Sequence, residues 1–166
     1  MRESMKSQIL LQQKMIEYYS GDPKRIQHFI KVHSFAKMIG ALEGLNASTQ
    51  NILEIAAIIH DIGIKISEEK YSNCNGKLQE QEGPAIAKKM LTELNYDDKI
   101  IERVCYLVGH HHTYNNIDGI DYQILVEADF LVNMYEDGLN KEAILSAYNK
   151  IFRTKSGSQL CKIIFL

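Results

Sequence analysis

The spacing of apolar residues along this chain predicts helices. Apolar side chains recur at intervals of three and four residues over long stretches, and only 2 prolines and 10 glycines interrupt the pattern. About six or seven helices account for the sequence, with no internal repeat, low-complexity stretch or linker between them. We therefore predict an all-α fold, a compact helical bundle that forms one domain over residues 1–166.

Capping signals and apolar content place the first helices of this bundle. Asp22 and Pro23 suit the N-cap and first turn of a helix that runs to about Ala41. Ser48 can cap the next helix, which is apolar on almost every side from Ile52 to Ile59. A helix with so few polar positions is expected at the centre of the bundle.

The rest of the chain consists of further helices and one polar segment. Residues 67–77 are polar, and we expect a loop or broken helix there that could cover a pocket. The later helices are expected at about 83–94, 97–111, 121–135 and 141–152. N-terminal and C-terminal helices would pack on a core of about residues 24–137. The apolar residues of the final segment indicate a docked terminal helix or a homodimer contact: Leu160, Ile163, Ile164, Phe165 and Leu166.

Composition excludes several classes of protein. Hydrophobic residues make up 45% and charged residues 24% of the chain, which is ordinary globular usage. Three cysteines without CxxC spacing argue against a disulfide framework and a zinc–thiolate cluster, and favour a reducing cytoplasm. No signal-peptide core is present, and no apolar run approaches the roughly 18 residues that would cross a bilayer. A net charge of -2 gives no field that would recruit a nucleic acid polymer.

Four potential metal ligands lie at apolar positions of three expected helices. His33 is at helical spacing from the apolar residues around it, His60 and Asp61 end the central helix, and Asp129 lies on the apolar face of the 121–135 helix. One such residue alone is more often a hydrogen-bonded core residue. Two buried carboxylates and two imidazoles together need a cation, however. The donor set suits manganese, iron, nickel, cobalt or zinc and does not choose among them.

The order of these residues resembles the HD-domain superfamily of metal-dependent phosphohydrolases. The segments FIKVHSFAKMIG, AAIIHDIGIK, VGHHHTY and ILVEADFLVN carry the resemblance, which spans about residues 24–137. It implies a divalent metal, magnesium included, held by His33, His60, Asp61 and Asp129.

The resemblance also raises the question of a second metal ion. In binuclear members of the superfamily a histidine precedes a Gly-Ala pair and others end the next helix. His111 and His112 resemble the later ligands, whereas residues 79–82 read Gln-Glu-Gln-Glu and hold no histidine. Glu80 or Glu82 could supply an oxygen instead, so one ion and two ions both stay open.

The resemblance implies hydrolysis of a phosphomonoester or phosphoanhydride of a small metabolite, with a nucleotide favoured. The candidate catalytic residues are Asp61, Lys65, His111 and His112. Lys65 lies one helical turn after Asp61, and we expect it to stabilise the negative charge that develops on the phosphoryl group. Two alternatives remain: an HD-fold di-iron oxygenase, and a regulatory module that binds metal and nucleotide without turnover. Phosphate release distinguishes the hydrolase from the regulatory module, and iron content with oxygen uptake identifies the oxygenase.

Overall fold

The computed structural model describes residues 2–166, with side chains from Ser7 onward, and these residues form nine helices and no strand. The all-α prediction is confirmed. In chain order the helices are α1 (Arg2–Tyr18), α2 (Pro23–Leu42), α3 (Ala47–Ile59), α4 (Ile64–Tyr71), α5 (Gly76–Glu93), α6 (Asp98–Val108), α7 (Ile120–Glu136), α8 (Lys141–Ile151) and α9 (Lys155–Phe165). Over the described part of the chain, no helix is long and apolar enough to cross a membrane.

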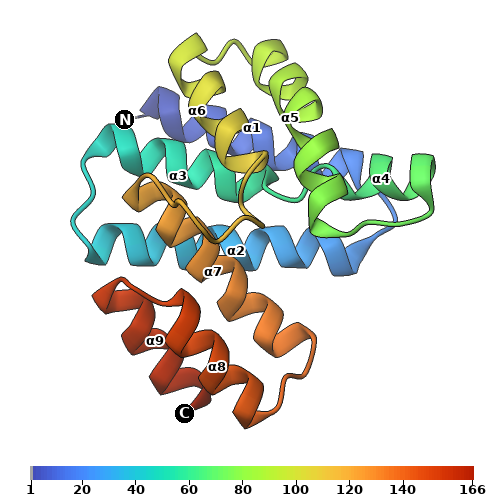
Figure 1. The fold of residues 1–166 in the computed structure, drawn as a ribbon. Helices are drawn as coiled ribbons and strands as arrows, with labels where there is room; N and C mark the ends of the chain where they lie inside the picture. The colour runs from blue at the N-terminus through green and yellow to red at the C-terminus, as the bar shows by residue number, and fades with distance from the viewer. Residues whose placement is uncertain (1) are drawn as a thin grey trace.

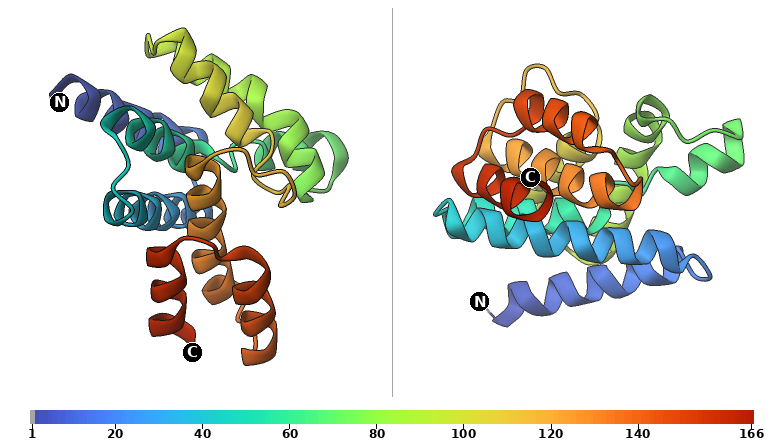
Figure 2. Two further views of the ribbon diagram at one scale, coloured as in Figure 1. Left: turned by 60° about the vertical axis from the view of Figure 1, so that its left-hand side comes forward. Right: turned by 90° about the horizontal axis from the view of Figure 1, so that it is seen from below.

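Helix α3 lies at the centre of the bundle, as its apolar sequence predicts. Every residue from Leu53 to Ile59 is buried, and the helix contacts α1, α2, α6 and α7 (Figure 1). Helix α7 packs on both α2 and α3. The α5–α6 pair and the α8–α9 pair lie on opposite sides of the molecule, with α7 between them (Figure 2). The C-terminal end of α3 therefore meets α2 and the middle of α7 inside the bundle.

The capping predictions hold at the first helix and fail at the second. Asp22 accepts a hydrogen bond from the backbone N–H of Arg25, and Pro23 opens α2. Helix α3, in contrast, is capped by Asn46, whose side chain accepts from Thr49, and not by Ser48. Asparagine is as good an N-cap as serine, so the helix begins at the earlier of two adequate caps.

The polar segment is a broken helix, one of the two forms expected for it, but the helix after it begins earlier than predicted. Residues 64–71 form α4, and a break follows at Ser72, which has a left-handed φ of 52°. Helix α5 then begins at Gly76, capped by Asn75, rather than at Gly83. Pro84 lies inside α5 and does not end the helix, although it lacks the N–H that would bond a carbonyl in the preceding turn. This earlier start adds almost two turns to α5.

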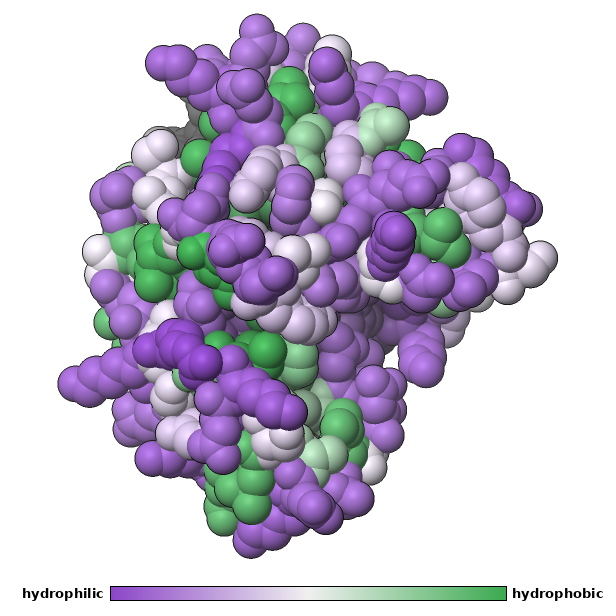
Figure 3. Space-filling view, viewed as in Figure 1, coloured by the Kyte–Doolittle hydropathy of each residue, from purple (hydrophilic) through white to green (hydrophobic). Residues whose placement is uncertain are grey.

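The C-terminal residues form a docked helix. Helix α9 packs on α7, α8 and α2, as one of the two interpretations of the apolar C-terminal segment predicts. Its N-terminus is fastened to α7 through Glu127, which is fully buried. The Glu127 carboxylate accepts bonds from the backbone N–H groups of Arg153 and Thr154, from the hydroxyl of Thr154 and from the Gln123 amide. The face in Figure 3 is mainly hydrophilic, with small separate apolar groups, and the homodimer stays a prediction.

Candidate metal centre

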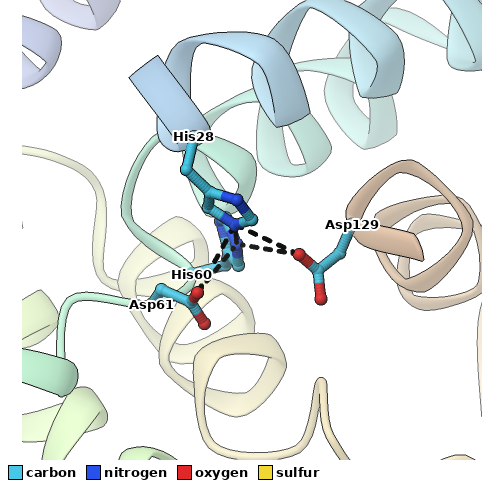
Figure 4. A group of neighbouring side chains, drawn as sticks. All are labelled: His28, His60, Asp61 and Asp129. Carbon is cyan, nitrogen blue, oxygen red and sulfur yellow. Dashed lines mark hydrogen bonds and ion pairs between the residues drawn. The ribbon is translucent and has the colours of Figure 1, made fainter. Parts of the chain in front are cut away.

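Four buried side chains from three parts of the fold point toward one another. His28 comes from α2, His60 and Asp61 from the end of α3, and Asp129 from α7 (Figure 4). His28 Nε2 lies 3.2 Å from His60 Nε2 and 3.2 Å from Asp129 Oδ1, while Asp61 Oδ2 lies 3.5 Å from His28 Nε2. Ligand atoms bonded at about 2.0–2.1 Å to one ion are separated by roughly 3.0–3.4 Å, so this group fits a divalent metal.

The first histidine of the site is His28, and the expectation that His33 would bind the metal is wrong. On α2, His28, Val32 and Ala36 form a row spaced by four residues in which every residue is buried. His33 lies one position off this row. Its Nδ1 is 3.1 Å from the Gln12 amide, and its Nε2 is 3.6 Å from Glu54. The i, i+4, i+8 spacing from His28 to Ala36 puts His28 on an apolar row as well, so the sequence allowed either histidine.

Hydrogen bonds orient the rings so that their Nε2 atoms face the centre. His60 Nδ1 lies 2.9 Å from the carbonyl oxygen of Ala57, and His28 Nδ1 lies 2.8 Å from Glu136. Each Nδ1 donates its hydrogen, so Nε2 is the atom that faces the centre, where it can bind a metal once it is unprotonated. Asn133 in turn donates to Asp129 Oδ1 at 2.9 Å.

The electrostatics of the group also indicate a cation. Burial alone would raise the pKa of the Asp61 and Asp129 carboxyl groups, yet the imidazoles of His60 and His28 hold both values well below normal. Burial would likewise lower the pKa of His28, but the carboxylates, Asp129 foremost, raise it to about 9. The carboxylates are therefore ionised in the interior and need positive charge beside them, which bound protons or a metal ion can provide.

Asp61 also belongs to a second group, with His111 and His112. Its Oδ2 faces the first group, whereas its Oδ1 lies 2.8 Å from His111 Nε2 and 3.5 Å from His112 Nε2. His111 is buried, and its Nδ1 lies 3.0 Å from the carbonyl oxygen of Val108. Its Nε2 therefore faces Asp61, in the same way that the Nδ1 bond of His60 turns the Nε2 of His60 toward the centre of the first group. The sequence suggested His111 and His112 as ligands of a possible second metal or as catalytic residues, and the structure places both beside Asp61.

Neither glutamate proposed as an oxygen ligand lies in this group. Glu80 accepts bonds from the backbone N–H of His112 and from the Thr113 hydroxyl, so it supports the turn after α6. Glu82 pairs with Lys70 at 2.6 Å and accepts from Tyr71 at 2.8 Å. The expectation for Glu82 is therefore wrong, because its position on α5 turns it toward α4.

Lys65 also lies away from the centre, contrary to the expectation that it stabilises charge there. Its ammonium donates to the carbonyl oxygen of Tyr18 at 3.1 Å and lies 5.0 Å from the Tyr18 ring centre. One helical turn from Asp61 brings the backbone of Lys65 near the site but directs its side chain toward α1. Lys24 and Arg25 supply the cations beside the centre instead.

A cavity of about 530 Å³ opens over the first group. Its wall contains Asp61, His28 and His112, and it is closed partly by Cys74 from the segment after α4. The cavity has a polar floor, two cations and some apolar surface. The remaining residues that line it are Lys24, Arg25, Phe29, Ile64, Gln79, Tyr114, Asn133, Glu136 and Asp137.

Comparisons with known proteins agree with this geometry. A family model described as the HD domain matches residues 25–150. A crystal structure described as a predicted HD superfamily hydrolase from an uncultured Thermotogales bacterium superposes with a TM-score of 0.67 at 20% sequence identity. The match covers 92% of this chain and 82% of that one. A search of curated proteins found no match.

Proposed function

Because the chain belongs to the HD-domain family, we propose that it is a metal-dependent phosphohydrolase, cleaving a phosphomonoester or phosphoanhydride of a small metabolite. A nucleotide is the favoured substrate class. The observation that carries the proposal is the group of His28, His60, Asp61 and Asp129, whose donor atoms face one point beneath an open cavity. The description of the Thermotogales protein as a predicted hydrolase agrees with this proposal.

The donor set holds the metal and the cavity holds the substrate. A divalent ion in such a site supplies an acidic water and polarises a phosphoryl oxygen. Lys24 and Arg25 lie in the cavity wall, where they can bind phosphate charge. Glu68 fixes the Arg25 guanidinium through two bonds of 2.6 and 2.9 Å. These residues take the role that the sequence suggested for Lys65.

His112 is placed to exchange a proton with the substrate. Its ring is only partly buried and lines the cavity. Burial would lower its pKa, but Asp61, Asp129 and Glu80 outweigh burial and raise the pKa above its usual value. A protonated imidazole at the cavity wall can donate to the leaving oxygen. His111 is fully enclosed and orients Asp61.

The direct test combines metal content with phosphate release. The purified protein is expected to contain a divalent metal and to release phosphate from a member of a nucleotide panel with added manganese. Asp61→Ala and Asp129→Ala should lose both properties, with turnover reduced more than about 100-fold, since even an outer partner of a metal ligand is worth roughly 10–100-fold. Metal binding without phosphate release would contradict the proposal. Oxygen uptake by an iron-loaded protein would then indicate an oxygenase, and its absence a regulatory module.

Lys65→Met gives a second expected result. The variant should keep the turnover of the wild type within about twofold, because the ammonium contacts α1 and not the cavity that holds the substrate. Arg25→Met should raise KM or lower kcat more than tenfold, as expected for a lost charge-assisted phosphate contact. Steady-state kinetics of the two variants compares them directly. Equal activity loss in both would show that Lys65 reaches the substrate after all.

A further inference from the structure

An ion pair joins α4 to α2 at the edge of the cavity. Helix α4 packs mainly on α5, and its residue Glu68 reaches across to Arg25 of α2. The guanidinium of Arg25 donates from Nη1 and from Nη2 to the two carboxylate oxygens of Glu68, at 2.9 and 2.6 Å. Arg25 also lies in the cavity wall. A side chain of α4 thus contacts a residue of the cavity through two charge-assisted hydrogen bonds.

This ion pair determines which edge of the guanidinium stays open. A guanidinium has two edges with a pair of parallel donors, one formed by Nη1 and Nη2 and the other by Nε and Nη2. Glu68 occupies the first edge, and the Asp22 carboxylate lies 3.2 Å from Nη1. Among the described residues, none accepts a hydrogen bond from Nε of Arg25. The second edge therefore keeps two donors in the arrangement that binds two oxygens of a phosphate.

Two carboxylates attract Arg25 toward different places. Arg25 borders the cavity and also a smaller hollow of about 150 Å³, and Asp22 lines the smaller hollow. Glu68 lies beside Cys74, which lines the cavity: burial and the Glu68 carboxylate raise the pKa of the Cys74 thiol. Without Glu68, Asp22 would be the carboxylate that remains beside the guanidinium. Glu68 is therefore the partner that keeps Arg25 on the cavity side.

We infer that Glu68 is a positioning residue, which holds Arg25 so that Nε and Nη2 form a two-donor fork for the phosphoryl group of the substrate. The inference rests on the proposed function, because the fork binds a phosphorylated substrate. It makes α4 a part of the substrate site. Charge alone predicts the opposite effect, since an anionic side chain near a bound phosphate repels it. Positioning and repulsion therefore differ in sign when the charge of Glu68 is removed.

Binding of inorganic phosphate tests the inference without measuring turnover. The titration is done by calorimetry on manganese-loaded protein after gel filtration. Glu68→Gln should weaken phosphate binding about tenfold, because the fork is no longer held toward the cavity. Arg25→Lys keeps the charge and can still pair with Glu68, but an ammonium has no second edge, so binding should weaken by about the same factor. Adding Glu68→Gln to Arg25→Lys should then restore part of the affinity, because the ammonium is released to the phosphate.

Glu69→Gln is the matched control. Glu69 is the next residue of α4 and is exposed, so removal of this screened charge should leave phosphate binding within about twofold of the wild type. Thermal melting verifies that each variant is folded. Unchanged or tighter phosphate binding by folded Glu68→Gln, or unchanged binding by Arg25→Lys, would overturn the inference and leave the proposed function intact. The expected pattern in a protein that releases no phosphate from any nucleotide would instead contradict the proposed function and support the inference.

Discussion

Replacing His28 by alanine is expected to abolish metal retention and to reduce phosphate release more than about 100-fold, the minimum expected for loss of a direct ligand. His28 provides one of the two imidazole nitrogens of the first group, and its Nε2 lies within 3.5 Å of Asp61, His60 and Asp129. Without it, the two ionised carboxylates keep only His60 as a nitrogen partner in that group. Elemental analysis and phosphate release on the same preparation measure both effects.

His33→Ala is the matched control for this prediction. His33 lies five residues later on the same helix and is also partly buried, but its contacts are with Gln12 and Glu54. This variant should keep its metal and its turnover, although its melting temperature can fall because Glu54 loses a partner. If His33→Ala lost the metal and His28→Ala kept it, the assignment made from the structure would be wrong.

The sequence predicted His33 as a ligand, whereas the structure places His28 there, and this difference shows what residue spacing can and cannot resolve. Both histidines are within one turn of apolar residues, so periodicity over a few positions places either on an inner face. Only the contacts of α2 with α3 and α7 decide which side of its apolar face meets the HD pair. His60 and Asp61 could be predicted because they end the almost wholly apolar α3, and Asp129 because it lies on the apolar face of α7.

The fold was predictable where periodicity and caps agree, and less so around α4 and α5. Long apolar repeats predict α2, α3, α6 and α7 to within a few residues of the observed bounds. Pro84 and Gly83, in contrast, indicate a helix start, although Asn75 caps α5 earlier and the helix tolerates the proline. Because α5 was predicted to begin at Gly83, Gln79 was not expected inside a helix beside His112. Its position beside His112 follows only from the tertiary packing.

Replacing Glu127 by alanine is expected to lower the free energy of unfolding by about 3–5 kcal/mol, because it leaves several buried donors without an acceptor, at about 1–3 kcal/mol each. Four donors bond this carboxylate, at 2.5 to 2.9 Å: two backbone N–H groups, one hydroxyl and one side-chain amide. Gly157 also packs so closely on the carboxylate that no side chain fits there. Alanine would leave these donors buried without an acceptor and would loosen the start of α9.

Chemical denaturation measures this loss, and two further variants isolate its cause. Glu127→Gln keeps one acceptor oxygen and should cost clearly less than alanine. Glu142→Gln changes an exposed acidic residue in the first turn of α8 and should stay within about 0.5 kcal/mol of the wild type. Glu127 precedes Asp129 by two residues, which puts them on different faces of α7. Folded Glu127→Ala should therefore keep its metal at low temperature. Metal loss without a loss of stability would show that Glu127 acts on the site rather than on the attachment of α9.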